Sequence, residues 1–176
     1  MNNRIFIRLI FCLALIIFGC SKDVPVSSEL TQSEQGSVLG KAGGATQISG
    51  IGSFAGTGEC TDEQATFALR MTGDLEGCLY TYVENSECSP SGTYREQGRE
   101  LFVGTYNGVP GTFRTTYKFE AKYQDCANLI GEKVGRCQHP IVAGSGTGVF
   151  AGVTGRLDFK DDVVVGNFPY TGHLRF

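Results

Sequence analysis

Strict alternation of apolar and polar residues over positions 111–123 is the feature that most limits how this chain can fold. In the segment GTFRTTYKFEAKY, Arg114, Lys118 and Lys122 share one face of an extended chain. The opposite face carries mostly apolar side chains: Phe113, Thr115, Tyr117, Phe119, Ala121 and Tyr123. Segments 65–71, 156–160 and 168–176 alternate in the same way. A helix would mix the two sets, so the pattern predicts strands with one face in a core and one in water.

Turn-forming residues separate these segments at short intervals. They are Thr72-Gly73-Asp74, Ser89-Pro90-Ser91-Gly92, Gln97-Gly98, Asn107-Gly108-Val109-Pro110-Gly111 and Gly166-Asn167. Short connections predict an up-and-down antiparallel meander, and closure into a barrel removes its exposed edges. We therefore expect an all-β domain over residues 46–176, a single closed antiparallel barrel of about eight strands. No segment is a convincing helix, although DCANLIGEKVG could supply one turn.

The first nineteen residues have the three parts of a secretory signal. Arg4 and Arg8 give a positive start, Leu9 to Phe18 form an apolar run, and Gly19 precedes Cys20. The run is shorter than the roughly 20 residues that a helix needs to cross a bilayer. Residues 1–19 are therefore expected to be a cleaved signal peptide.

The sequence Ile17-Phe18-Gly19-Cys20 resembles the lipobox of bacterial lipoproteins, with Phe18 in place of a smaller residue. The resemblance implies that Cys20 is the lipid attachment site and the first mature residue, whereas an ordinary signal peptide would leave an incidental cysteine. Acyl chains on Cys20 would anchor the protein stably in a membrane. Ser21 after the cysteine and the Lys22-Asp23 pair resemble lipoproteins that reach the outer membrane or the cell surface. We expect a lipid-anchored protein of the cell envelope, in the outer membrane, with the leaflet left open.

Residues 20–45 have no apolar periodicity and are rich in Ser, Gln and Gly, which predicts a flexible tether after the acylated cysteine. The whole chain has 15 basic and 18 acidic side chains, and cleavage would remove two of the basic ones. The remaining basic residues are scattered. Nucleic acid is therefore not an expected partner.

Glycines are densest in the segment GSGTGVFAGVTGRLDF at 144–159. A shorter segment of similar composition, GSFAGTGE, lies at 52–59. The following residues alternate as a strand, so a phosphate loop, which needs a helix N-terminus, is disfavoured. The glycines are expected to serve bends and bulges of the backbone. The segment resembles the Gly-Thr-Gly-x-Phe-x-Gly stretch of the allene oxide cyclase-like barrels, a group that includes the dirigent proteins. The resemblance implies an eight-stranded barrel around a small lumen, but it assigns no catalytic residue here.

Five cysteines follow Cys20, an odd number in a chain expected to be exported: Cys60, Cys78, Cys88, Cys126 and Cys137. In the meander, Cys60 and Cys88 fall at the same rim, so they are the first expected disulfide. The second joins Cys126 to either Cys137 or Cys78 and leaves one thiol over. A Cys78–Cys88 bridge is disfavoured by strand length. No Cys-x-x-Cys pair occurs, so a zinc site is not expected, and neither is any other metal or cofactor.

Candidate lumen residues come from two strands. Tyr117, Phe119 and Tyr123 form an aromatic row that suits either a filled core or a ligand cavity. Glu76 and Tyr80 share one face with Cys78, Tyr82 and Glu84, and this face is expected to point outward. If it faced the lumen, its carboxylates would be candidates for acid–base chemistry. His139 precedes Pro140 at a possible bend, and His173 is expected to point to solvent.

Three functions remain open. The first is a membrane-anchored binding or scaffold lipoprotein whose specific ligand is not predicted, with a small apolar molecule as one candidate partner. The second is an isomerase or cyclase that acts on a small apolar or phenolic substrate in the lumen. The third is a small integral outer-membrane barrel, suggested by the C-terminal alternation that ends at Phe176 and opposed by Arg114, Lys118 and Lys122. No catalytic constellation is visible, and the source and oligomeric state are not predicted.

Overall fold

The computed structural model of the protein describes residues 44–176. The expected signal peptide, Cys20 and nearly all of the expected tether lie outside these residues. Within them, no helix long and apolar enough to cross a membrane is found. The strands are β1 (Thr46–Phe54), β2 (Phe67–Gly73), β3 (Leu75–Cys88), β4 (Thr93–Tyr106), β5 (Val109–Asp125), β6 (Ile130–Pro140), β7 (Thr147–Gly148), β8 (Thr154–Lys160) and β9 (Phe168–Arg175).

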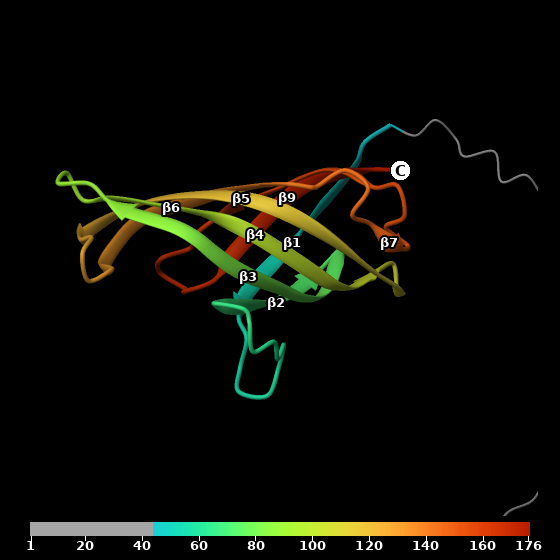
Figure 1. Ribbon diagram of the computed structural model, residues 1–176, viewed down its shortest axis with the longest axis horizontal. Helices are drawn as coiled ribbons and strands as arrows, with labels where there is room; N and C mark the ends of the chain where they lie inside the picture. Colours follow the sequence, from blue (N-terminus) through green and yellow to red (C-terminus); the bar gives the residue numbers. More distant parts are fainter. Residues whose placement is uncertain (1–43) are drawn as a thin grey trace, which may run out of the picture. The chain divides into compact units, whose positions relative to one another are not determined.

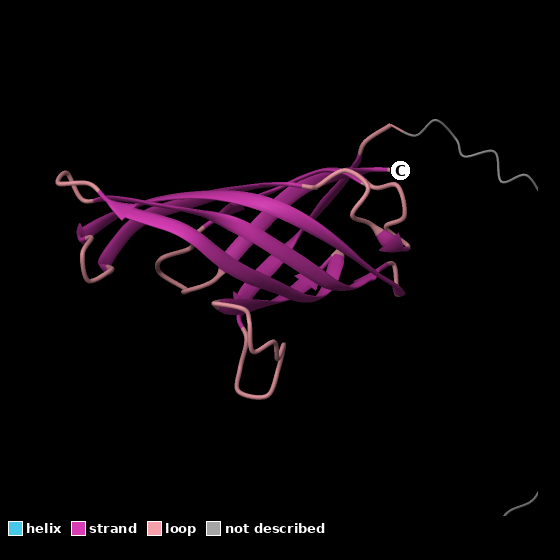
Figure 2. Ribbon diagram, viewed as in Figure 1, coloured by secondary structure: helices cyan, strands magenta, loops and turns pink. Residues whose placement is uncertain are grey.

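The strands form one closed antiparallel barrel (Figures 1 and 2). Neighbours pair in the order β1-β2-β3-β4-β5-β6-β8-β9, and β9 pairs back with β1, which closes a ring of eight strands. The two-residue β7 adds to one end of β5. This confirms the all-β class and the closed barrel of about eight strands expected from the alternation.

The predicted turn at Gln97-Gly98 is wrong, because β4 runs without interruption through both residues. Gly98 faces a register shift between Val83 and Asn85 of β3. A Cβ atom on Gly98 would lie 2.1 Å from the carbonyl oxygen of Tyr82 and 2.9 Å from the ring of Tyr117. The glycine is therefore needed for close approach at a bulge rather than for a turn. Segment 125–135 forms a hairpin and contains no helical turn.

The barrel has one sealed end. Here lie the β2–β3 and β4–β5 turns and the long β6–β8 connection, residues 141–153. Phe150 of this connection packs into the barrel, with its ring centroid 5.7 Å from that of Phe102 and 4.9 Å from that of Phe113. Residues 141–153, which we call the plug, close this end of the barrel.

The glycines of segment 144–159 let the plug fold tightly. A Cβ atom on Gly146 would lie 1.7 Å from the carbonyl oxygen of Phe150. Gly148 has a φ of 58°, in the left-handed region that favours glycine. The segment then continues into β8. The expectation that these glycines serve the backbone is confirmed.

Two disulfides form, and neither expected pairing is among them. Cys60 is bonded to Cys78, and Cys88 is bonded to Cys126. The expected Cys60–Cys88 bridge, and those of Cys126 with Cys137 or Cys78, are wrong. The prediction kept Cys60 at the rim, but the β1–β2 loop folds back over the outside of β3, where the Tyr82 hydroxyl donates to Asp62 at 2.7 Å. Among the described residues Cys137 is the one free thiol.

Candidate ligand-binding cavity

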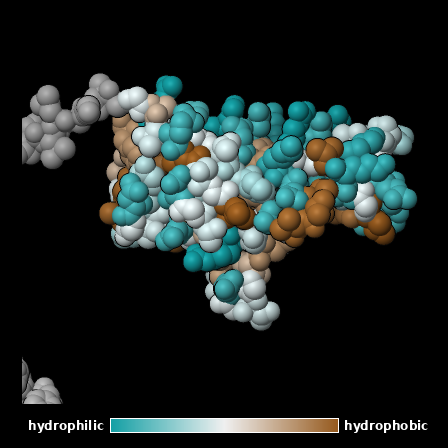
Figure 3. Space-filling model, turned by 180° about the vertical axis from the view of Figure 1, so that it is seen from behind, coloured by the Kyte–Doolittle hydropathy of each residue, from teal (hydrophilic) through white to brown (hydrophobic). Residues whose placement is uncertain are grey.

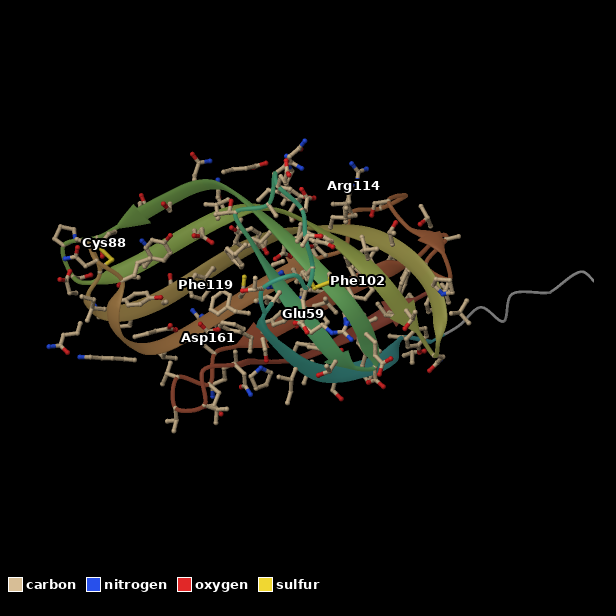
Figure 4. The ribbon with its side chains drawn as sticks, turned by 90° about the horizontal axis from the view of Figure 1, so that it is seen from below. Glu59, Cys88, Phe102, Arg114, Phe119 and Asp161 are labelled. Atoms are coloured by element: carbon tan, nitrogen blue, oxygen red, sulfur yellow. A yellow bond between two sulfur atoms is a disulfide. The ribbon has the colours of Figure 1, made fainter. Side chains whose placement is uncertain are left out.

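The half of the barrel next to the sealed end is filled with apolar side chains. Fully buried here are Met71, Leu75, Leu79, Phe102, Phe113, Phe150, Val153, Leu157 and Leu174. The other half, next to the β3–β4 and β5–β6 hairpins, encloses a cavity of about 400 Å³. In Figure 4, Phe119 and Asp161 of this cavity lie between Cys88 and Phe102, whereas Arg114 lies on the outside. A cavity of this size lies in the usual range for small-molecule sites.

Aromatic side chains form a large part of the cavity wall. Those from β2, β4, β5, β8 and β9 are Phe67, Tyr94, Tyr117, Phe119, Tyr123, Phe159 and Phe168. Phe54, which is 64% exposed, stands at the opening and contacts Phe168 edge to face at 5.0 Å between ring centroids. The period-two pattern of β5 produces this wall, because alternate residues of a strand share one face.

A carboxylate and an imidazole meet inside the barrel at the inner limit of the cavity. Oε2 of Glu100 on β4 lies 2.5 Å from Nδ1 of His139 on β6, and the two side chains are 3% and 5% exposed. Thr81 donates to Oε1 of Glu100 at 3.1 Å, and Thr115 donates to Oε2 at 2.6 Å. Burying a carboxylate is costly unless it accepts hydrogen bonds, so these donors stabilise Glu100 in its buried position.

The other ring nitrogen of His139 has no partner. Nε2 is buried without a hydrogen bond, although the side chain lines the cavity. The ring is held by Glu100, by stacking on Tyr117 and by contact with Phe159 at 4.6 Å between centroids. A buried polar atom without a partner is uncommon and marks a place where a ligand or water completes the bonding.

A second carboxylate, Glu96, lies further along β4 and is held by two tyrosines. The hydroxyls of Tyr94 and Tyr117 donate to its two oxygens at 2.7 and 2.8 Å. Burial, and then the hydrogen bond to Glu96, raise the pKa of Tyr94 and that of Tyr117. Both hydroxyls therefore stay protonated at neutral pH and keep donating to Glu96.

Glu132 and Asp161 form the third acidic group of the cavity. Both carboxyl groups approach Gly135, where a Cβ atom would meet Oδ2 of Asp161 at 2.3 Å and Oε1 of Glu132 at 2.4 Å. Tyr123 donates to the other oxygen of Glu132 at 3.3 Å. Burial, then the hydrogen bond and negative charge of Glu132, raise the pKa of Asp161 to about 7. Asp161 therefore holds a proton in mildly acidic solution.

The thiol of Cys137 lies in the same wall. Burial raises its pKa, and the charge of Glu100 raises it further. The thiol therefore stays protonated and does not act as a thiolate nucleophile.

The sequence-predicted lumen residues divide into two groups. Tyr117, Phe119 and Tyr123 line the cavity, whereas Glu76 and Tyr80 do not. On β3 the inward face belongs to Leu79, Thr81 and Val83, so Glu76 and Tyr80 point outward. Their expected outward orientation is confirmed, and the acid–base role that depended on the opposite orientation is not supported.

Sequence reasoning missed Glu100 and left His139 without a role. A signal for Glu100 was present, because Glu100 lies two positions before Phe102 and so shares its strand face. The apolar Phe102 indicates that this face points into the core. The contact of His139 with Glu100, 39 positions away, depends on the register of the strands, which no local sequence pattern predicts.

Comparison with protein-family models and with curated proteins finds no match for this chain. Among residues 44–176, no group of three His, Cys, Asp or Glu side chains is placed to hold a metal ion. The fold and the cavity therefore carry the functional argument.

Proposed function

We propose that this protein is a lipid-anchored protein of the bacterial cell envelope whose barrel binds one small, mainly apolar molecule. The observation that carries this proposal is the hollow half of the barrel, a cavity of about 400 Å³ with aromatic walls. Few convergent polar groups on an apolar wall are typical of small-molecule sites. The unpartnered Nε2 of His139 supplies a polar contact at the inner limit.

The division of the barrel supports binding over a purely structural role. A barrel that serves only as a scaffold gains stability from a filled interior, since buried apolar area stabilises at about 25 cal/mol per Å². Here the plug and its neighbours fill one half, and the other half is left open beside a buried Glu–His pair. Such a pair is costly to bury, which fits a role in contacting a ligand.

The anchoring part of the proposal rests on the sequence. The apolar run, the lipobox-like residues before Cys20 and the Ser-rich segment after it suit a chain attached through acyl groups. Two disulfides in the barrel suit an oxidising compartment outside the cytoplasm.

The outer surface favours a tethered barrel over an integral membrane barrel. Arg114, Thr116 and Lys118 form an exposed outward row on β5. Figure 3, which shows the molecule from behind, has hydrophilic and hydrophobic residues mixed on the face that it draws. A barrel that spans a bilayer needs a continuous apolar belt.

An isomerase that acts in the lumen is the second candidate. The Glu100–His139 pair favours it, because a carboxylate that orients an imidazole is a common arrangement for proton transfer. The tyrosines of the cavity are not free to stabilise a developing negative charge, since the hydroxyls of Tyr94, Tyr117 and Tyr123 already donate to carboxylates. Binding is therefore the function that the geometry supports better.

Native mass spectrometry of the mature chain carrying Cys20→Ala tests the binding function. We expect a co-purified small molecule that is lost in His139→Phe, with the barrel still folded by circular dichroism. A chain that binds neither endogenous molecules nor hydrophobic fluorescent probes would contradict the proposal.

Membrane extraction tests the anchor separately. The wild-type chain is expected to resist alkaline washing and to dissolve in detergent, whereas Cys20→Ala with a cleavable signal peptide is released as a soluble protein. Retention of Cys20→Ala in the alkali-washed membrane would favour the integral barrel instead.

A further inference from the structure

The charged groups that line the cavity are mainly acidic. Four residues with carboxyl groups line it, Glu96, Glu100, Glu132 and Asp161, and no lysine or arginine does. The only side chain there that can carry a positive charge is His139. A molecule with its own negative charge would therefore enter a region of like charge.

The tyrosine hydroxyls of the cavity, and the two threonine hydroxyls beside Glu100, already donate to carboxylates. Thr81 and Thr115 donate to Glu100, Tyr94 and Tyr117 donate to Glu96, and Tyr123 donates to Glu132. In the neutral imidazole of His139, Nδ1 carries the hydrogen because it faces Oε2 of Glu100. Nε2 is then an acceptor, nine-tenths or more buried, lining the cavity without a partner.

Glu132 and Asp161 are the acidic residues of the cavity with unused bonding capacity. Each oxygen of Glu96 and Glu100 receives at least one donor, but Oε1 of Glu132 has none in its surroundings except Asp161. Asp161 can donate to it only while protonated. Without that proton, two carboxylates lie together in a half-buried place and repel each other.

From these observations we propose that the ligand is an apolar amine, whose protonated nitrogen binds between Glu132 and Asp161 while its apolar body lies along the aromatic wall. This deepens the proposed binding function and depends on it. An ammonium group brings a positive charge and several N–H donors, which suits a cavity that offers acceptors. Aromatic faces of Tyr123 and Phe119, which line the same cavity, add attraction for a cation.

Binding of the amine is expected to release the proton that Asp161 holds. In mildly acidic solution Asp161 holds a proton, and the ammonium takes that proton's place between the two carboxyl groups. The titratable groups that face Asp161 are Glu132 and Cys137 from β6 and Tyr123 from β5. Because the thiol and the phenol remain neutral, binding is expected to tighten as pH rises from 6 to 8, with release of protons.

Three probes with the same chain and different head groups test the proposal: decylammonium, 1-decanol and decanoate. The protein is the full mature chain with Cys20→Ala, free of lipid and detergent, and calorimetry at pH 8 gives the dissociation constants. We expect decylammonium to bind at least tenfold more tightly than decanol, and decanoate to bind most weakly. In two buffers of different ionisation enthalpy, decylammonium is expected to release protons at pH 6.

The double variant Glu132→Gln/Asp161→Asn keeps the shapes of both side chains and removes their charges. Its preference for decylammonium over decanol is expected to fall to less than threefold, with decanol affinity unchanged. Glu76→Gln, an exposed carboxylate on the outside of β3, is the matched control and should change nothing. Thermal unfolding checks that each variant is folded.

The possible outcomes distinguish the amine proposal from the more general proposal that the cavity binds a small molecule. Decanoate that binds as tightly as decylammonium, or a double variant that keeps the full preference, overturns the amine proposal while leaving the binding function intact. If none of the three probes binds to a folded protein, both proposals fail.

Discussion

At the scale of single residues, the buried Glu100–His139 pair is the most demanding feature of the barrel. Both side chains are almost completely buried and lie among aromatic rings. Taking charged or polar groups out of water is costly, so removing one member leaves the other without its main partner. The pair should therefore behave as one unit in stability measurements.

A double-mutant cycle tests this. Glu100→Leu and His139→Leu are each expected to lower the free energy of unfolding by about 3–5 kcal/mol. The double variant should lose clearly less unfolding free energy than the sum of the two single losses. It removes both the carboxylate and the imidazole, so neither is left buried without its partner. Urea unfolding gives the values.

The exposed pair of Arg99 and Glu84, 3.5 Å apart, is the control for that cycle. Alanine at both positions is expected to change stability by no more than about 1 kcal/mol. Strictly additive losses for Glu100 and His139 would contradict the idea that they act together.

Asp161 should make stability depend on pH. Its pKa is raised from 3.8 to about 7, so the folded protein binds more protons than the unfolded chain between these values. Stability then falls as pH rises from about 4 to 7, and Asp161→Asn should flatten this slope. Thermal unfolding across the range measures it, and a slope that is unchanged in the variant would show that another group is responsible.

At the scale of elements, local patterns predicted strands well and loops poorly. The inward row of β5 from Phe113 to Tyr123 follows from alternation alone, which is a property of neighbouring residues. The path of the β1–β2 loop over the outside of β3 depends on contacts such as that of Asp62 with Tyr82, far away in the sequence. For this reason the strand faces were predicted, whereas the partner of Cys60 was not.

The same reasoning applies to the cavity. Its aromatic wall could be predicted, because Tyr117, Phe119 and Tyr123 share one strand face. The meeting of Glu100 with His139, and that of Glu132 with Asp161, depends on how β4, β6 and β8 are arranged around the barrel. Their registers are set by the whole ring of strands.

The two disulfides should contribute unequally. Cys88 and Cys126 are 38 positions apart, and Cys60 and Cys78 are 18 apart. In the chain-entropy description, the longer loop stabilises by about 0.7 kcal/mol more. Paired serine variants of each bridge, compared by urea unfolding, test this order, and peptide mapping without reduction tests the pairing itself.

The plug should tolerate no side chain at Gly146. A Cβ atom there would meet the carbonyl oxygen of Phe150 at 1.7 Å, so Gly146→Ala must displace backbone and is expected to cost several kcal/mol, about as much as Phe150→Ala at 3–5 kcal/mol. Gly56→Ala, where the nearest atom is 3.5 Å away, is the matched control. A Gly146→Ala protein as stable as the control would mean that the plug packs differently.

At the scale of the whole molecule, the barrel combines a filled half and a hollow half on the same strands. Strands β3, β4 and β5 run through both, so their two ends have different surroundings. Amides beside Phe102 and Phe113 lie in the packed half, and those beside Tyr94 and Tyr123 flank the cavity. Local stability should differ along single strands.

Hydrogen exchange measured by mass spectrometry can detect this difference. Amides of the packed half are expected to exchange at least tenfold more slowly than those of the cavity half, and a bound ligand should slow only the latter. Uniform protection along β4 and β5, with or without ligand, would show that the hollow half is as rigid as the filled one.

The position of β1 has a consequence for how the cavity is reached. Thr46 pairs with Leu174 at the sealed end, so the chain enters the barrel at the end opposite the cavity. A ligand that enters beside Phe54, the last residue of β1, therefore does not have to pass Thr46 at the other end of the same strand.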